Sequence, residues 1–146
     1  MRLTTQTDYS LRMLMFLAYS DDRLVTISEV AEHYQISRNH LMKVAHVLGQ
    51  DGFIETVRGR SGGLRLARPP AEINLGEIVR LLERDSVLVE CFQKNSTTCL
   101  ITPACRLKKV LADVMESFCR VLDEHTLADL VYHNEALSRL LKAEAA

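Results

Sequence analysis

The chain has 146 residues, of which 47% are hydrophobic and 25% are charged, and its formal net charge is −1. This composition suits one folded domain with a hydrophobic core and excludes an intrinsically disordered chain. No apolar run reaches the roughly 20 residues of a membrane helix and no basic leader precedes the first element, so we expect a cytoplasmic protein without a membrane partner.

Two capped helices are predicted at the start of the chain. Thr5, followed three residues later by Asp8, has the form of a capped helix start, and the apolar spacing after it predicts a helix over about 7–19. Thr26 and Glu29 repeat the capping pattern. A short second helix is therefore expected after them.

A third predicted helix carries side chains that can contact DNA on its outer face. The positions expected to point inward are Leu41, Val44, Ala45 and Leu48. The cap and the outer face present residue types that hold phosphates or reach base edges, namely Ser37, Arg38, Asn39, His40 and Lys43. An ordinary solvated helix surface is the alternative for this set.

A β-hairpin with a basic tip is predicted next. Residues 53–57 and 64–66 alternate as two short strands, and the glycine-rich loop between them contains Arg58 and Arg60. Two arginines that flank a glycine can enter a narrow minor groove of DNA. A helix, a helix–turn–helix and a hairpin in this order are typical of a winged helix–turn–helix DNA-binding domain, which we assign to residues 1–84. The expected fold is therefore mainly α with a small β-hairpin wing.

The second half of the chain has the pattern of a connector followed by a long helix. A fourth helix is predicted over 74–84, a cysteine-containing loop over 85–105, and a long amphipathic helix with a final helical segment over 126–143. A long amphipathic helix attached to a small domain needs a second apolar surface. Because two-fold DNA sites match helix–turn–helix dimers, we favour a dimerisation role for the long helix over packing on the same subunit. Residues 106–146 are assigned to this dimerisation helix and the C-terminal helical segment.

Four cysteines require an explanation, because three of them lie in the predicted loop: Cys91, Cys99 and Cys105. Thiolates are soft ligands that select zinc, copper(I) or iron–sulfur clusters, whereas a disulfide framework is disfavoured in a reducing cytosol. The spacing matches neither a ferredoxin nor a zinc ribbon, and a fourth ligand is missing. The remaining cysteine, Cys119, follows Phe118 in the long helix and is expected to pack as a small hydrophobe.

Catalytic motifs are lacking from the sequence. There is no Gly-x-Ser-x-Gly elbow, no Walker loop and no Cys-x-x-Cys pair, and the five histidines do not have metalloprotease spacing. We therefore expect that the protein is not an enzyme.

Five segments of the chain carry a resemblance to a known family. They are Met-Arg-Leu-Thr-x-x-Thr-Asp-Tyr at 1–9, Ser-Arg-Asn-His at 37–40, Val-Arg-Gly-Arg-x-Gly-Gly at 57–63, Ile-Thr-Pro-Ala-Cys-Arg-Leu-Lys at 101–108 and Thr-Leu-Ala-Asp-Leu-Val at 126–131. In these segments the chain resembles the bacterial iron–sulfur winged-helix regulators, and most of all the nitric-oxide-sensing repressors among them. The resemblance covers nearly the whole chain and is most specific in the cysteine segment.

The resemblance implies a homodimer that binds a palindromic promoter site and holds an iron–sulfur cluster, with 4Fe–4S favoured and 2Fe–2S as the alternative. Cys91, Cys99 and Cys105 would be the thiolate ligands, and Asp8 of the partner subunit would be the fourth. Nitric oxide acting on the cluster would lift repression. The alternative role for Asp8 is that of a first-turn acid that interacts with the helix dipole.

Departures from the pattern bear on the subfamily. IscR-type regulators have a histidine ligand three residues after the third cysteine, where this chain has Lys108, and RirA-type regulators lack an aspartate at position 8. The gap of seven residues between Cys91 and Cys99 is longer than in some nitric-oxide sensors, which leaves the cluster type open. Two alternatives remain: a regulator of iron or iron–sulfur status that uses the same cysteines, and a zinc-stabilised interaction module.

Overall fold

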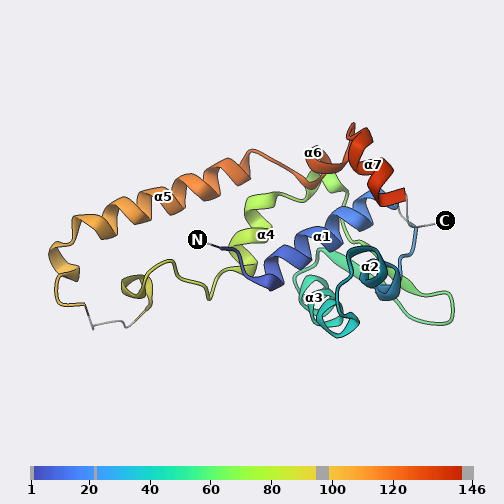
Figure 1. The fold of residues 1–146 in the computed structure, drawn as a ribbon, viewed down its shortest axis with the longest axis horizontal. Coiled ribbons are helices and arrows are strands. Elements are labelled where there is room, and N and C mark those ends of the chain that lie inside the picture. The colour runs from blue at the N-terminus through green and yellow to red at the C-terminus, as the bar shows by residue number, and fades with distance from the viewer. Residues whose placement is uncertain (1, 22, 95–98, 143–146) are drawn as a thin grey trace.

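The computed structural model describes residues 2–21, 23–94 and 99–142 and is mainly helical with one two-stranded hairpin, as predicted (Figure 1). The helices and strands, in chain order, are α1 (Thr5–Tyr19), α2 (Ile27–Tyr34), α3 (Arg38–Gln50), β1 (Ile54–Val57), β2 (Gly63–Leu66), α4 (Leu75–Leu82), α5 (Arg106–Asp123), α6 (Leu127–Val131) and α7 (Glu135–Lys142). Short 3-10 helices occur at Pro70–Glu72, Glu90–Phe92 and Thr102–Ala104.

The start of α1 is capped by Thr4, so the prediction that Thr5 is the cap is wrong. The Thr4 hydroxyl accepts the backbone N–H of Thr7 at 3.3 Å. A carboxylate from α4 completes the cap: Glu83 Oε1 accepts the Thr4 N–H at 2.8 Å and the Thr4 and Thr7 hydroxyls at 2.9 and 2.5 Å. Burial alone would raise the pKa of Glu83, but these hydrogen bonds and one from Ser86 lower it. The start of α1 is therefore fastened to the end of α4.

Helix α4 begins as predicted. Asn74 is its cap, and the Asn74 side chain accepts the backbone N–H of Glu77 at 3.1 Å. The helix ends at Leu82, two residues before the predicted end, because Glu83 leaves the helix there to reach α1.

Helices α2 and α3 form the predicted helix–turn–helix. The capping box before α2 is present, with the Thr26 hydroxyl accepting the Glu29 N–H at 3.2 Å and the Glu29 carboxylate accepting the Thr26 N–H at 2.7 Å. Gln35 ends α2 in the left-handed region, at φ 53°, which turns the chain toward α3. Ser37 occupies the cap position of α3, but its side chain makes no capping hydrogen bond. All four predicted inward positions of α3 are buried: Leu41, Val44, Ala45 and Leu48.

Strands β1 and β2 pair antiparallel and form the predicted wing. Val25, just before α2, bridges Leu64 and so ties the wing to the helix–turn–helix. Two glycines are needed to close the tip. Gly59 has a φ of 115°, which favours glycine, and a Cβ at Gly62 would collide with the carbonyl oxygen of Val57.

A single hydrophobic core joins α1, the helix–turn–helix, α4 and the C-terminal helices. Helices α6 and α7 pack against α1, and Leu127 and Leu141 are buried in this core. The segment predicted as helical over 126–143 is divided into two helices, because His133 adopts a left-handed φ of 58° between them. The predicted end at residue 143 lies outside the described residues.

Helix α5 extends away from this core beside α4 (Figure 1). Arg80 of α4 holds its last turn through two hydrogen bonds to Asp123, at 3.0 and 2.5 Å. None of its residues is buried, and four members of its predicted apolar face are 48% to 62% exposed: Leu107, Val110, Val114 and Val121. Within the described residues no helix has both the length and the apolarity of a membrane span.

Candidate nucleic-acid interface and cysteine segment

The outer face of α3 carries the predicted DNA-contacting residues. All five are exposed: Ser37, Arg38, Asn39, His40 and Lys43. The helix contains no aspartate or glutamate, so this face is neutral to basic. The set lies at the N-terminal half of the second helix of the motif, which is the part that reaches base edges in the major groove.

The wing adds positive charge on the same side of the molecule. Arg58 and Arg60 lie at its exposed tip and form no ion pair with any described residue. The other two arginines of the hairpin region are already committed, since Arg65 and Arg68 pair with glutamates of the same chain at 3.0 and 3.2 Å. In Figure 1 the helix–turn–helix and the hairpin lie on the side of the core away from α5. The exposed tip arginines and the exposed face of α3 are therefore both available for contacts with phosphates.

The cysteine segment leads from α4 to α5. Cys91 lies half-buried in the 3-10 helix Glu90–Phe92, Cys99 is exposed, and Cys105 is the half-buried residue that precedes α5. All three are free thiols. Among the described residues, no group of three or more histidine, cysteine, aspartate or glutamate side chains is close enough to hold a metal ion. The three predicted thiol ligands are therefore present in one subunit, but they do not lie close enough together to bind one metal ion. Residues 95–98 of this segment lie outside the described part of the chain.

Asp8 faces an open pocket on the first turn of α1. Arg12, one turn later, holds both carboxylate oxygens: its Nε lies 3.1 Å from Oδ1 and its Nη2 lies 2.9 Å from Oδ2. The Asp8 side chain is still 46% exposed, and the pocket of about 520 Å³ that it lines also includes Arg2 and Tyr34. The carboxylate is thus fixed in direction yet accessible from outside. Arg12 was not among the predicted site residues, although a spacing of four residues between acid and base on a helix is a usable signal.

Tyr9 connects this pocket to α3. The guanidinium carbon of Arg12 lies 5.9 Å from the centre of the Tyr9 ring, and that ring lies 6.1 Å from the imidazole of His40 at a tilt of 40°. Asp8 is therefore linked to the first turn of α3 by a short chain of side-chain contacts. Nothing in the sequence relates positions 9 and 40, because the contact arises from the packing of α1 across α3.

Cys119 lies apart from the other cysteines. It lines a mainly apolar pocket of about 420 Å³ between α4 and α5, together with Met115 and Phe118. It is half-buried rather than part of the core, and its sulfur contacts the guanidinium of Arg80. It is next to Phe118 as the sequence shows, but it does not join the hydrophobic core, and its contact with Arg80 has no signal in the sequence.

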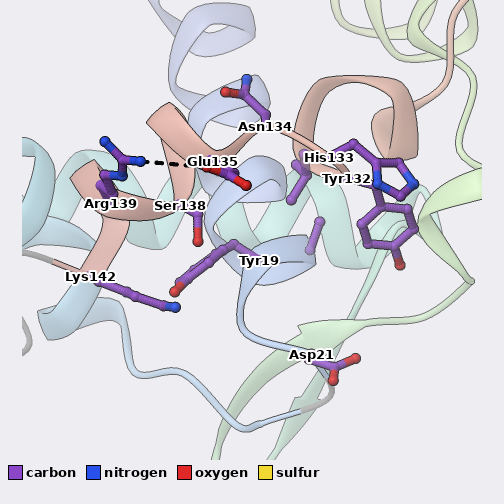
Figure 2. A pocket seen from close by; sticks show the side chains of 11 residues that line it. Tyr19, Asp21, Tyr132, His133, Asn134, Glu135, Ser138, Arg139 and Lys142 are labelled. Atoms are coloured by element: carbon purple, nitrogen blue, oxygen red, sulfur yellow. Dashed lines mark hydrogen bonds and ion pairs between the residues drawn. The ribbon is translucent and has the colours of Figure 1, made fainter.

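A further open pocket, of about 730 Å³, lies between the end of α1 and the pair α6–α7 (Figure 2). Tyr19, Tyr132 and Lys142 are among its lining residues, and Arg139 pairs with Glu135 at its rim at 3.4 Å. None of the predicted site residues lines it. The pocket therefore has no part in the predicted DNA or metal site.

These features define a class of protein. A helix–turn–helix with an acid-free outer face, followed by a wing with two uncommitted arginines, is a winged helix–turn–helix DNA-binding protein. The model of the Rrf2 family, described as an iron-dependent transcriptional regulator, matches residues 3–133. The chain belongs to the Rrf2 family.

Curated relatives and solved structures agree with this assignment. The HTH-type transcriptional regulator NsrR of Bacillus subtilis (strain 168) is 51% identical over 143 residues, which is 97% of this chain and 98% of the relative. NsrR of Shouchella clausii is 48% identical over 97% of this chain and 96% of its own length. The oxidized form of Staphylococcus aureus CymR has a TM-score of 0.71 at 28% identity, covering 91% of this chain and 98% of that one. For T. potens IscR the TM-score is 0.67 at 27% identity, with 100% and 93% covered.

The chain is thus a transcriptional regulator and not an enzyme, as the sequence predicts. The resemblance that the five sequence segments carry is confirmed over nearly the whole chain. The winged-helix fold expected from the order of elements is confirmed by the likeness to CymR and IscR.

Proposed function

We propose that this regulator is a nitric-oxide-responsive repressor that binds promoter DNA as a homodimer and holds an iron–sulfur cluster through Cys91, Cys99 and Cys105. One observation carries the proposal. The same chain has an exposed, basic helix and wing of the kind that bind DNA, and three free thiols on the segment that connects α4 to α5. The description of the family as iron-dependent supports iron as the metal. The identity of about half to the NsrR regulators supports nitric oxide as the signal, through the motifs that this chain shares with nitric-oxide-sensing repressors.

The donor set fits an iron–sulfur cluster in its chemistry. Three thiolates are the ligands that such clusters use, and Asp8 of the partner subunit is the proposed fourth ligand. The pocket in front of Asp8 contains Arg2 and Arg12, whose charges would offset those of thiolates brought against it. When bound, the cluster would supply the iron with which nitric oxide reacts. We favour 4Fe–4S, with 2Fe–2S as the alternative.

The uncovered face of α5 supports the homodimer. Four apolar side chains on one helix are about half-exposed or more, whereas monomers rarely leave such a contiguous patch in water. A second copy of α5 would cover it, and a two-fold dimer places two recognition helices against two half-sites. In such a dimer the cysteine segment of one subunit can approach the Asp8 pocket of the other, which would complete a site that one chain does not gather.

The contacts around Asp8 suggest how the metal site controls DNA binding. If Asp8 held the cluster of the other subunit, Arg12 and Tyr9 would couple its position to His40 at the start of α3. Without that ligand bond, α1 and α3 would no longer be held to the other subunit, and the two recognition helices would not keep the spacing of about 34 Å between half-sites. A coupling of about 1–3 kcal/mol between the sites would change DNA affinity about 5- to 150-fold.

Two other functions use the same residues. A regulator of iron or iron–sulfur status would employ the same three cysteines, but Lys108 stands where IscR-type proteins have a histidine ligand. A zinc-stabilised interaction module would need a fourth ligand to close a tetrahedral site, and the iron dependence of the family disfavours it.

Native mass spectrometry under strict anaerobiosis tests the proposal, because it reports subunit number, iron and sulfide together. We expect a dimer that carries iron and sulfide, and a change in that cofactor mass after nitric oxide is added. A cofactor that responds to iron chelation but not to nitric oxide would favour the iron-status regulator. A colourless protein that contains only zinc would favour the interaction module.

A further inference from the structure

Met42 is an apolar side chain in an exposed place on an otherwise polar helix surface. It is the fifth residue of α3 and is 55% exposed, and it does not pack against the hydrophobic core. Asn39 precedes it by three residues and His46 follows it by four, so the three side chains lie on one side of the helix. Asn39 is one of the predicted DNA-contacting residues, whereas Met42 is not.

The charge around Met42 favours duplex DNA as the molecule that would cover it. Arg38 and Lys43 flank it, α3 has no acidic residue, and the tip arginines of the wing lie on the same side of the molecule. A protein partner would need an acidic surface that also contained an apolar socket. Duplex DNA provides both features, because phosphates line the major groove and the C5-methyl group of thymine is the apolar group on its floor.

We propose that Met42 reads a thymine methyl group in the operator, beside the base that Asn39 contacts. The inference rests on the proposed function, since it requires α3 in the major groove. Met42 lies about 6 Å from the start of the helix along its axis, at about 1.5 Å per residue, which keeps it within the half that enters the groove. The unbranched thioether side chain is long and adaptable, so it can follow the methyl group without displacing the flanking polar contacts.

Replacement of thymine by uracil tests the inference, because it removes the methyl group and leaves the hydrogen-bonding edge unchanged. The operator is first enriched from random-sequence duplexes with the cluster-loaded, full-length protein. Each thymine is then replaced in turn, and the Kd is measured for the wild type and for Met42→Ala, Met42→Leu and Lys43→Ala. Leu140→Ala is the matched control, since Leu140 is 68% exposed on α7, far from α3 in Figure 1.

For the wild type and for the Leu140→Ala control, we expect at least one uracil substitution to raise the Kd about fourfold. This figure follows because burial of one carbon contributes about 0.8 kcal/mol and a tenfold change in Kd corresponds to about 1.4 kcal/mol. Met42→Ala should bind the thymine and uracil forms of that duplex equally, and Met42→Leu should restore part of the difference. Lys43→Ala should weaken both forms alike. Wild-type protein that binds every uracil duplex as well as the thymine parent would overturn the inference, as would a loss that persists unchanged in Met42→Ala. If no sequence is enriched at all, the proposed function itself fails, which is a separate outcome.

Discussion

Asp8 has a geometry that suits both its ion pair within the chain and its proposed role as a metal ligand. Its two oxygens are held by Arg12 within the chain, yet nearly half of its side chain remains accessible at an open, basic pocket. An acid that acted only on the helix dipole would need neither the pocket nor the fixed direction. The residue can therefore act as a preoriented ligand for a metal presented by another subunit.

Asp8→Ala should destabilise the proposed cluster and weaken binding of the cluster-loaded protein to DNA. We expect a changed visible absorption spectrum, because one ligand is lost, and a fall of the ratio of cluster-loaded to cluster-free DNA affinity toward one. Asp85→Ala is the matched control, since Asp85 is 96% exposed and lies outside the pocket. An unchanged spectrum together with an unchanged response to nitric oxide would remove Asp8 from the mechanism.

Tyr9→Leu should uncouple the metal site from DNA while leaving both intact. The substitution removes the ring between Arg12 and His40, so the affinity ratio between cluster-loaded and cluster-free protein should fall from the expected 5- to 150-fold range to a few-fold at most. Tyr9→Phe keeps the ring and should behave as the wild type. Absorption spectra of both variants report the cluster independently. Full regulation in Tyr9→Leu would rule out this contact path.

At the scale of elements, two features stand out. The Glu83 carboxylate ties the start of α1 to the end of α4. The apolar face of α5 is left uncovered within one chain. Hydrophobic spacing predicts the second from sequence alone. It does not predict the first, because the two partners are 76 residues apart and only the packed fold brings them together.

Glu83→Gln should lower the free energy of unfolding in a pH-dependent manner. Burial raises the pKa of Glu83, but its hydrogen bonds outweigh this and lower the pKa below the ordinary value of 4.5 in the folded chain. The carboxylate therefore stabilises the fold above that value, and this stabilisation is lost as the pH falls through the folded pKa. We expect a loss of about 1–2 kcal/mol at pH 7 that shrinks toward zero in acid.

Urea denaturation of the cluster-free protein measures this difference without interference from metal loss. Glu72→Gln is the control, because Glu72 is exposed. A destabilisation of the Glu83 variant that stayed the same from pH 7 to pH 3 would show that the carboxylate charge has no part in it.

Val110→Glu combined with Val114→Glu should convert the proposed dimer to a monomer. The two side chains are 55% and 48% exposed on α5, so charges there should leave the fold of one subunit intact while opposing the burial of this face. Sedimentation velocity should show half the mass, and circular dichroism should show unchanged helix content. Substitution of Glu116, which already carries a charge on α5, by Lys provides a control. A double variant that remained dimeric would place the subunit interface elsewhere.

At the scale of the whole molecule, the sequence predicts the helices and strands better than the contacts between them. Capping residues, helical spacing and the glycine-rich hairpin are local signals, and they located the helix–turn–helix and the wing. The division of the C-terminal segment at His133 was missed, because a left-handed residue other than glycine has no clear local signature. The route from Asp8 to His40 was missed for the same reason as the Glu83 contact, since it exists only after α1 has packed on α3.

The proposed metal site cannot be predicted from one chain alone. The cysteine pattern indicates thiolate ligands for a soft metal, and the family description indicates iron. Among the described residues of a single subunit, however, no three donor side chains lie close enough together to bind a metal. The proposed site shared between subunits would account for this difference, because dimerisation would then be a condition of metal binding and metal loss would loosen the dimer on DNA.

Fluorescence anisotropy of a selected operator duplex, titrated anaerobically with protein before and after nitric oxide, tests this account most directly. The wild type should bind tightly at first and weaken at least fivefold after the gas is added. A variant with Cys91, Cys99 and Cys105 all replaced by serine should bind weakly from the start and should not respond. If that variant binds and releases the duplex as the wild type does, the three thiols do not control this regulator.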